Sequence, residues 1–560
     1  MHQPRTLYTT VGILIALSCI VHFRATGQSI DQVTISSSGW LGITNITPYK
    51  NKLYFFGSYD NYRNKLLSSD GIGPGTTLVK QLDNATFLSA WNMYVTNNLL
   101  VFFNNNKVWR SDGTEAGTFI LKNISIYGAT TGAPSHACAV LNDKLYFAGD
   151  STQSNPVKDQ LWVTDGTVGG TKLVKTINPS GPAGIGGMFV SDGKLYFYAY
   201  DGSGNGYWCQ PWVSDGTPAG TFKLKAVKST IYGDALPMGY TPYNGKVYFR
   251  MTDDTSATQL WVTDGTSAGT TKVTKIFPKN TMGLYPTYMA VYNSKLYFTG
   301  YDSTLNPQLW VTDGTAAGTK ILKADSTSRK RAGFQPGNKV GYHNKLYMSA
   351  WDSVWGLQLW STDGTLSGTT RITSKQGYYP QRIIIYQDKI VMTAMDTLSK
   401  MEEVFISDGT AAGTVCPKPP VVNSQAFVHF DQWVPFQNAL YFRAAYTYWQ
   451  DYELYRVTFG ASSVGDASMM KAPERYALAQ NFPNPFNPST TISFTLPGNS
   501  FVSLKVFDII GREVATLVSE SMHAGTYQRE WNAGTLPSGV YFYRIQAGVF
   551  TETKKLLLTR

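Results

Sequence analysis

The feature that most constrains this chain is a short phrase, Ser/Thr-Asp-Gly followed by a loop and Gly-Thr, which recurs eight times at intervals of about fifty residues. Seven copies read Asp-Gly-Thr-x-x-Gly-Thr in full, and the first copy, at 70–76, is degenerate. A regular spacing of this length predicts one supersecondary unit copied many times. The phrase therefore belongs to the fold, and no single copy is read as an active site. Its Asp residues are Asp70, Asp112, Asp165, Asp215, Asp264, Asp313, Asp363 and Asp408.

Each copy also carries two apolar patterns that are typical of strands. A Leu-Tyr-Phe pattern lies upstream, as at 296–298, and a Leu-Trp-Val pattern leads into the phrase, as at 309–311. Turn residues separate four short β segments in the clearest copy, namely 288–292, 295–299, 308–312 and 319–323. The pattern predicts one small antiparallel sheet of four strands per copy.

Both faces of such a sheet are apolar, because successive residues of these patterns point to opposite faces. A sheet of this kind needs a neighbour on each side. A ring of radially packed sheets provides the neighbours, whereas an open solenoid needs polar capping copies, which the sequence lacks. The sequence thus predicts an all-β, multi-bladed β-propeller.

The two ends of the repeat array indicate how the ring closes. The last copy, at 427–457, has inner strands, a Leu-Tyr-Phe pattern and an equivalent of the Trp strand, but it has no Asp-Gly phrase and no fourth strand. A lone strand pattern at 32–35 precedes the first copy. We expect this N-terminal strand to complete the last sheet. The count is then nine blades, with eight as the alternative if the first or last copy is not a true blade.

The Asp-Gly phrase itself is interpreted as a tight turn before the outer strand. Gly accepts a positive φ, and Asp and Thr side chains bond to nearby backbone amides. A calcium site is the alternative, since Asp supplies hard oxygen ligands. Each turn offers a single carboxylate, however, and calcium sites usually draw on several oxygens. No cofactor is expected.

The N-terminal segment 1–27 has the pattern of a signal peptide, because Arg5 precedes an apolar run and 25–27 offers small residues for cleavage. No later segment is apolar enough to cross a membrane, so the mature chain is expected to be exported. The net charge of +11 is spread thinly, without the Lys/Arg cluster that would bind phosphates, so nucleic acid is excluded as a partner.

A second, different domain follows the array. The predicted propeller spans 28–459, and 460–473 has the Gly, Ser and Ala composition of a flexible linker. The segment 474–560 contains about seven short strand patterns, which predict a small Ig-like β-sandwich.

Two resemblances to known families add to these predictions. The repeats resemble the Glu-Leu-Trp-x-Ser-Asp-Gly-Thr-x-x-Gly-Thr repeats of large secreted bacterial proteins, which implies a propeller without known catalysis. The last domain closely resembles the C-terminal sorting domain of type IX secretion substrates, which implies that an outer-membrane secretion machine reads it as an address. The second resemblance rests on four motifs, Asn481-Phe-Pro-Asn-Pro-Phe-Asn-Pro, Val506-Phe-Asp-Ile-Ile-Gly-Arg-Glu-Val, Leu536-Pro-Ser-Gly-Val-Tyr and Lys554-Lys-Leu-Leu-Leu.

The residues favour binding over catalysis. No His lies in a metalloprotease motif and no nucleophile elbow is present, so no catalytic or metal-binding residue is named. We expect a cell-surface or extracellular binding or adhesion protein for a glycan, protein or matrix. A propeller-based hydrolase or lyase with dispersed channel carboxylates is the alternative. Loop aromatics that would stack on sugars, or else pack between blades, are Tyr207, Trp208, Trp351, Trp355, Tyr448 and Trp449.

One further pattern lies in the loop after the Leu-Tyr-Phe strand. Asp-Ser or Asp-Thr pairs recur there and resemble the acceptor pattern for O-glycosylation of exported proteins in bacteria with this secretion route. A simple Asp-Ser turn is the alternative. The candidate acceptors are Ser151, Ser303, Ser353 and Thr397.

Overall fold

The structure is a computed structural model of the 560-residue chain, which divides into two compact units. One unit comprises Met1–Tyr243 and Val247–Gly465, and the other Asn244–Lys246 and Asp466–Arg560. Every element in the described part is a β-strand. The residues described are 28–33, 42–59, 62–72, 76–82, 91–126, 137–152, 158–203, 209–228, 236–276, 282–325, 333–395, 402–417, 429–445, 453–459, 475–481, 483–497, 500–522, 525–534, 536–548 and 550–559.

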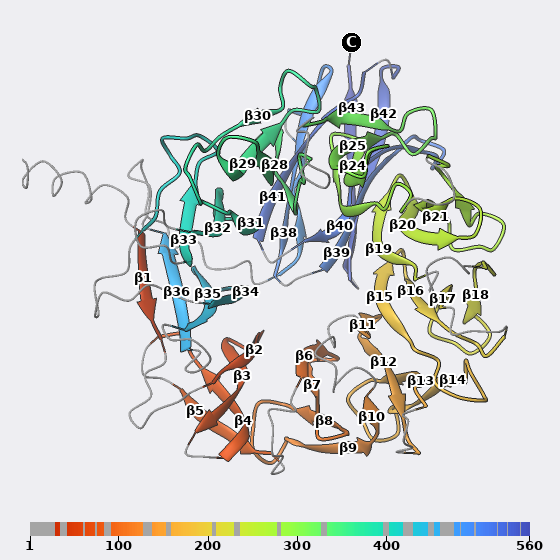
Figure 1. Ribbon diagram of the computed structural model, residues 1–560, viewed down its shortest axis with the longest axis vertical. Coiled ribbons are helices and arrows are strands. Elements are labelled where there is room, and N and C mark those ends of the chain that lie inside the picture. Colours follow the sequence, from red (N-terminus) through yellow and green to blue (C-terminus); the bar gives the residue numbers. More distant parts are fainter. Residues whose placement is uncertain are drawn as a thin grey trace, which may run out of the picture. The chain divides into compact units, whose positions relative to one another are not determined.

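The described residues of the first unit form nine small antiparallel sheets, numbered here in chain order (Figure 1). The first four sheets are built from β2 (Thr44–Tyr49), β3 (Lys52–Tyr59), β4 (Tyr62–Ser69) and β5 (Thr77–Gln81); β6 (Trp91–Thr96), β7 (Leu99–Asn104), β8 (Lys107–Ser111) and β9 (Phe119–Asn123); β11 (Cys138–Leu141), β12 (Lys144–Asp150), β13 (Gln160–Thr164) and β14 (Lys172–Lys175), with β10 (Ser125–Ile126) on β12; and β15 (Gly186–Ser191), β16 (Lys194–Ala199), β17 (Gln210–Ser214) and β18 (Phe222–Lys223).

The next four sheets follow the same order. They are built from β19 (Met238–Tyr243), β20 (Lys246–Asp253), β21 (Ala257–Thr263) and β22 (Thr271–Lys272); β23 (Thr287–Tyr292), β24 (Lys295–Tyr301), β25 (Pro307–Thr312) and β26 (Lys320–Lys323); β27 (Lys339–Tyr342), β28 (Lys345–Asp352), β29 (Gly356–Thr362) and β30 (Thr370–Arg371); and β31 (Gln381–Tyr386), β32 (Lys389–Met395) and β33 (Glu402–Ser407). In this eighth sheet a single bridge from Ile406 to Val415 takes the place of the outer strand.

The ninth sheet joins the two ends of the unit. It contains β34 (His429–Phe436), β35 (Ala439–Ala445) and β36 (Glu453–Phe459), and its outer strand is β1 (Gln28–Gln32). The register pairs Gln28 with Phe459 and Gln32 with Tyr455. The expected closing strand is therefore found, but it begins at Gln28 instead of residue 32, because Ile30 supplies the apolar side chain that is buried against the eighth and ninth sheets. Thr34 and Ile35 lie outside the described residues.

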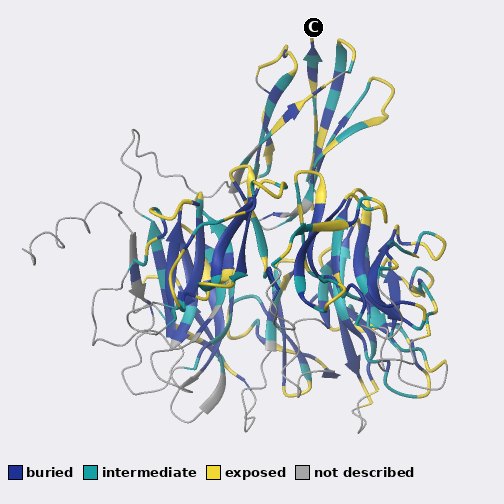
Figure 2. Cartoon of the chain, turned by 45° about the horizontal axis from the view of Figure 1, so that its top comes forward, coloured by how far each residue is buried: buried dark blue, intermediate teal, exposed yellow. Residues whose placement is uncertain are grey.

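The core of the unit lies between the sheets. Each pair of consecutive sheets encloses its own cluster of buried apolar side chains, and one such cluster joins the ninth sheet, through Val434 and Tyr441, to Leu53 and Phe55 of the first. Figure 2 shows the middle strands as continuously buried and the connecting segments as exposed. Both faces of each sheet are thus covered, as the apolar patterns require. The described residues form a closed ring of sheets, which is the architecture of a propeller.

The Asp-Gly phrase folds into a turn with its own hydrogen bonds. In the sixth sheet Asp313 Oδ1 accepts from the N–H and the hydroxyl of Thr315, at 2.9 and 2.7 Å. The Thr315 hydroxyl also accepts from the N–H of Gly318 at 2.9 Å. The hydroxyls of Thr312 and Thr319 lie 2.7 Å apart below this loop. The carboxylate of Asp313 therefore accepts its hydrogen bonds from within the turn. These bonds lower the pKa of Asp313 below its usual value.

The first Gly of the phrase also has a role between sheets. Gly314 has φ +94°, and a Cβ on it would overlap the phenol oxygen of Tyr248, from the Leu-Tyr-Phe strand of the preceding sheet. At the ring closure the Tyr441 hydroxyl donates to the carbonyl of Gly71 at 2.9 Å. The repeated Tyr and the repeated Gly thus lock neighbouring sheets together. The other Tyr–Gly pairs are Tyr54 with Gly113, Tyr146 with Gly216, Tyr196 with Gly265, Tyr297 with Gly364 and Tyr347 with Gly409.

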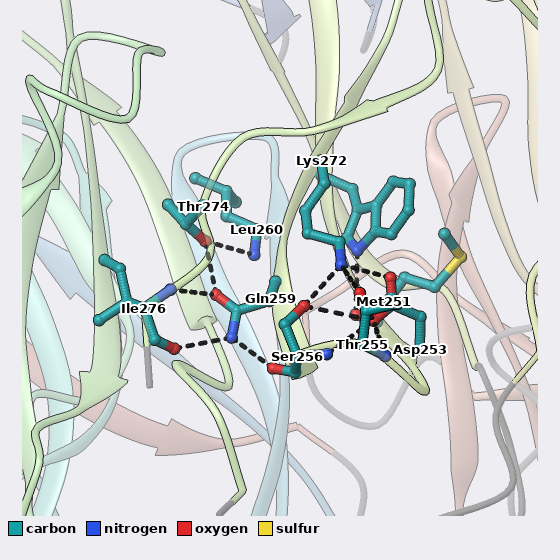
Figure 3. A network of polar contacts seen from close by, with 10 residues as sticks. Met251, Asp253, Thr255, Ser256, Gln259, Leu260, Lys272, Thr274 and Ile276 are labelled. Atoms are coloured by element: carbon teal, nitrogen blue, oxygen red, sulfur yellow. Dashed lines mark hydrogen bonds and ion pairs between the residues drawn. The ribbon is translucent and has the colours of Figure 1, made fainter. Parts of the chain in front are cut away.

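A repeated Gln on the third strand fixes the end of several sheets. Gln259, on β21, accepts from the N–H of Ile276 at 3.2 Å and donates to its carbonyl at 2.9 Å (Figure 3). Because Gln259 is fully buried, these bonds satisfy its amide inside the sheet stack. We call this pair of hydrogen bonds, from a Gln to the backbone of the residue seventeen positions later, a Gln bracket. The same bracket joins Gln210 to Val227, Gln308 to Asp325 and Gln358 to Lys375.

The second unit is a sandwich of seven strands in two sheets around one core. One sheet has the order β37, β38, β41 and the other β40, β39, β42, β43. Along β38 buried residues alternate with half-buried ones, as in a sheet with one face on a core. The strands are β37 (Ala477–Leu478), β38 (Ser489–Leu496), β39 (Ser500–Phe507), β40 (Glu513–Met522), β41 (Gly525–Asn532), β42 (Gly539–Ala547) and β43 (Phe550–Leu558).

Candidate ligand site on the loop face

The antiparallel pairing gives the ring of sheets two chemically different faces. The turn between the first and second strand and the Asp-Gly phrase between the third and fourth strand lie on one side, which we call the turn face. The hairpins between the second and third strands and the connections between sheets lie on the other side, the loop face. The repeated residues of the phrase are thus confined to the turn face.

Connections on the loop face differ from copy to copy. The hairpin between the second and third strands is 105–106 in the second sheet but 200–209 in the fourth. On the turn face, by contrast, the phrase has the same hydrogen bonds in one copy after another, as at Asp112 and Asp363. A repeat protein commonly binds a specific ligand through residues that differ between copies, because identical copies cannot form one distinct site.

A pocket of about 360 Å³ opens between the sixth and seventh sheets. Three tyrosines contribute to its wall, together with neutral polar groups such as Gln335 and Ser349. Tyr288 is 55% exposed, so its ring is available at the rim. The full lining is Tyr285, Thr287, Tyr288, Thr299, Gly300, Tyr301, Pro307, Gln335, Pro336, Gly337, Ser349 and Leu357. These residues come from the inner strand, the end of the second strand and the connections, all on the loop face.

The sixth copy differs from the fourth at one position of the pocket wall. Tyr198 pairs with Gly186 in the fourth sheet, and Thr299 holds the same position opposite Thr287 in the sixth. A Cβ on Gly187 would lie 2.8 Å from the Tyr198 ring, so that ring covers the inner strand. With Thr in place of Tyr198, the sixth copy leaves this space open.

Two tyrosines of the sixth copy have a backbone conformation that glycine adopts more easily. Tyr285 and Tyr288 have φ of 46° and 50°, whereas Gly184 and Gly187 hold the matching places in the fourth sheet. A non-Gly residue in this region costs about 1–3 kcal/mol and persists where the surrounding structure imposes it. Non-Gly residues have the same conformation at the place that matches Tyr288 in other sheets, such as Arg382 with φ 49°, so it belongs to the repeat. In the sixth copy both tyrosines line the pocket.

Two of the aromatic residues predicted as ligand contacts lie close to this pocket. Trp351 ends β28 and pairs with Leu357, which lines the pocket. Trp355 is half-buried, and the Arg371 guanidinium lies 5.7 Å from the centre of its ring. Neither indole is part of the pocket wall. Tyr207, Trp208, Tyr448 and Trp449 lie outside the described residues.

The pocket tyrosines were not among the predicted residues. Tyr285, Tyr288 and Tyr301 come from separate parts of the copy, and only the packing of the sixth sheet against the seventh adds Gln335 and Ser349. The sequence contained one usable signal, the replacement of Tyr198 by the smaller Thr299 at the same place in the repeat.

The predicted O-glycosylation positions lie on loop-face hairpins. Ser151, Ser303 and Ser353 are exposed. The Asp before each makes an Asx turn, as where Asp302 Oδ1 accepts from the N–H of Thr304 at 2.8 Å. The turn interpretation therefore describes the local geometry, and acceptance of a sugar stays a prediction. Thr397 lies outside the described residues.

Carboxylates are rare on the inner strands. Among the described residues, no three His, Cys, Asp or Glu side chains gather around one point. The nine inner strands, which include β31 and β34, contain a single carboxylate in their sequences, Asp431.

The described part of the chain contains no helix that would span a membrane.

Three solved structures that are similar to this chain are distant from it in sequence. The computationally designed Ika8 protein has a TM-score of 0.37 at 12% identity, over 77% of this chain and all of that chain. PorZ, a surface component of the type IX secretion system of Porphyromonas gingivalis, has a TM-score of 0.30 at 12% identity, over 92% and 86%. The β-propeller domain of the Trilobed protease from Pyrococcus furiosus has a TM-score of 0.27 at 11% identity, over 59% and 97%. These values carry no conclusion about activity.

The last domain gives the informative comparison. No curated protein matches the chain. Residues 480–559 match the family model described as the secretion system C-terminal sorting domain. These residues form the seven-stranded second unit, apart from the short β37. The chain therefore carries a sorting domain that directs it through the type IX secretion machinery to the cell surface or beyond.

Proposed function

We propose that the mature chain is an exported, non-catalytic binding protein whose loop face holds an extracellular glycan. The nine sheets are the blades of one closed propeller, of the type with Glu-Leu-Trp-x-Ser-Asp-Gly-Thr repeats, at 28–459. A signal peptide at 1–27 starts export, a linker spans 460–473, and the Ig-like sorting domain spans 474–560.

The pocket between the sixth and seventh sheets carries this proposal. Its wall combines tyrosine rings with hydroxyl and amide groups, which is the combination that binds sugars, because a sugar has apolar C–H faces and polar edges.

A non-catalytic role is the better proposal because the inner strands do not supply a carboxylate pair. Glycoside hydrolysis commonly needs two Asp or Glu residues that flank the scissile bond, and a lyase needs a positioned base. The pocket wall includes neither Asp, Glu nor His.

The test uses the purified mature chain with its sorting domain, on a panel of immobilised glycans. We expect selective binding to a small group of related saccharides, with no new product when the same saccharides are incubated with the protein and separated by chromatography. Uniform binding across the panel would contradict the glycan proposal, and released products would favour the alternative of a carbohydrate-active enzyme.

We further propose that Ser151, Ser303 and Ser353 accept sugars in the native host, because each is exposed on a loop-face hairpin. The expected result is an intact mass above that of the mature polypeptide, which returns toward it when the three serines are replaced by alanine. A native mass equal to that of the polypeptide would exclude the modification.

A further inference from the structure

The pocket between the sixth and seventh sheets has a positive charge behind its wall. Lys339 begins β27, and its Nζ donates to the carbonyls of Tyr288 and Gly337, at 2.9 and 3.1 Å, and to the Thr299 hydroxyl at 3.2 Å. All three acceptors belong to residues that line the pocket. Lys339 as a whole is partly exposed, but its amino group is enclosed.

No described carboxylate compensates this charge. The three acceptors of Lys339 are neutral, and the pocket wall contains neither Asp nor Glu. An enclosed cation without an anionic partner is costly, and this burial lowers the pKa of Lys339 to about 7. An anion in the pocket would remove much of that cost.

A second cation lies on the neighbouring fifth sheet. The guanidinium of Arg250, on β20, lies 4.6 Å from the centre of the Tyr285 ring. Tyr285 lines the pocket and also pairs with Tyr301, with ring centres 5.9 Å apart. The tyrosines of the pocket are thus flanked by Arg250 on one side and by Lys339 on the other.

We propose that this pocket binds an anionic saccharide, with the tyrosine rings against the sugar and its acidic substituent drawn toward Lys339 and Arg250. The inference rests on the proposed glycan-binding function and names the class of glycan. Both cations contact residues of the pocket wall, and charges in a partly enclosed site are screened less than in water, so an acidic group in the pocket adds to affinity as well as to selectivity. The volume of about 360 Å³ is within the range of small-ligand sites.

The test compares matched sugars on the mature chain with its sorting domain. Calorimetry with methyl glucuronide, methyl glucoside and glucose 6-sulfate separates a carboxylate, a neutral group and a sulfate on the same ring. We expect at least one of the two anions to bind about tenfold more tightly than methyl glucoside. Equal affinities would overturn the inference and leave glycan binding intact, whereas no binding of any of the three would count against the proposed site itself.

Variants then assign the effect to the two cations. Lys339→Met keeps most of the length of the side chain and removes its charge, so it should reduce the preference for the anionic sugar over the glucoside. Arg250→Gln should reduce the same preference, and it serves alone if Lys339→Met does not fold. Lys375→Met is the control, since Lys375 lies over Tyr378 and Phe405 outside the pocket. An unchanged preference in both pocket variants would overturn the inference.

Discussion

The two faces of the ring of sheets follow opposite rules. On the turn face, Asp313 and its equivalents repeat one hydrogen-bonded turn, and every first Gly except Gly166 contacts a Tyr of the preceding sheet. On the loop face the sixth copy replaces the Tyr198 of the fourth copy with Thr299 and opens a pocket. The comparison teaches that repetition here maintains the ring, while the proposed ligand specificity depends on residues that differ between copies.

The largest expected effect is on the turn face. Gly314→Ala should lower the free energy of unfolding by about 2–4 kcal/mol, because the new methyl group combines a strained φ of +94° with an overlap on Tyr248. Urea unfolding followed by tryptophan fluorescence measures it. Gly245→Ala is the matched control, since Gly245 has φ +67° and open space around it, and about 1 kcal/mol is expected. Equal losses would contradict the Tyr–Gly lock.

The next effect tests whether the copies are equivalent. Thr315→Val removes the hydroxyl that joins Asp313 to Gly318, and we expect a loss of about 1 kcal/mol. Thr266→Val makes the same change in another copy, where Thr266 bonds Asp264 and Gly269. Their losses should agree within error, and the double variant should show their sum, because the sites are far apart in the chain. A large loss from one and none from the other would break the idea of interchangeable turns.

A smaller effect of opposite sign is expected on the loop face. Tyr288→Gly relieves a φ of +50° and should raise the free energy of unfolding by up to about 1 kcal/mol, while saccharide binding weakens. Tyr379→Gly is the control, because Tyr379 also has positive φ, +44°, but does not line the pocket. It should stabilise the protein without changing binding. Unchanged saccharide binding in Tyr288→Gly would contradict a role of this side chain in the pocket, and a lower free energy of unfolding would contradict the expected relief of strain.

The smallest effect per residue concerns acid. Hydrogen bonds from the adjacent Thr lower the pKa values of Asp112, Asp215, Asp313 and Asp363 below the usual 3.8. Because each carboxyl is more acidic in the folded state, its contribution is present above the unfolded pKa and is lost as pH falls through the folded one. The melting temperature should therefore drop below about pH 4. The slope should be shallower in Thr315→Val, and an identical slope would exclude this contribution.

Local structure was the part that the sequence revealed best. The four segments expected in the sixth copy are close to the observed β23 to β26, because their apolar patterns and turn residues act within a few positions of one another. The closing strand was expected from the incomplete last copy, yet its bounds shifted to Gln28–Gln32, because burial of Ile30 sets them. The Tyr–Gly lock and the Gln259 bracket were not expected, since both depend on contacts that only the packed sheets create.

The pocket was the least accessible to sequence reasoning. Thr299, Gln335 and Ser349 belong to different segments, and nothing local marks them as neighbours. Only the folded structure shows that the Lys339 amino group donates to three neutral oxygens. Such a site can be suspected from sequence only by comparing copies with one another, as Tyr198 with Thr299.

The pairing of β1 with β36 has a consequence for the order of events in biosynthesis. Gln28 pairs with Phe459, so the two residues are separated by almost the whole sequence of the unit. Contacts with so large a sequence separation form late. The ninth sheet lacks its outer strand until that pairing occurs, and the residues that follow Phe459 lead to the sorting domain. A chain interrupted during synthesis before Phe459 thus lacks both the last strand of the ring and the sorting domain.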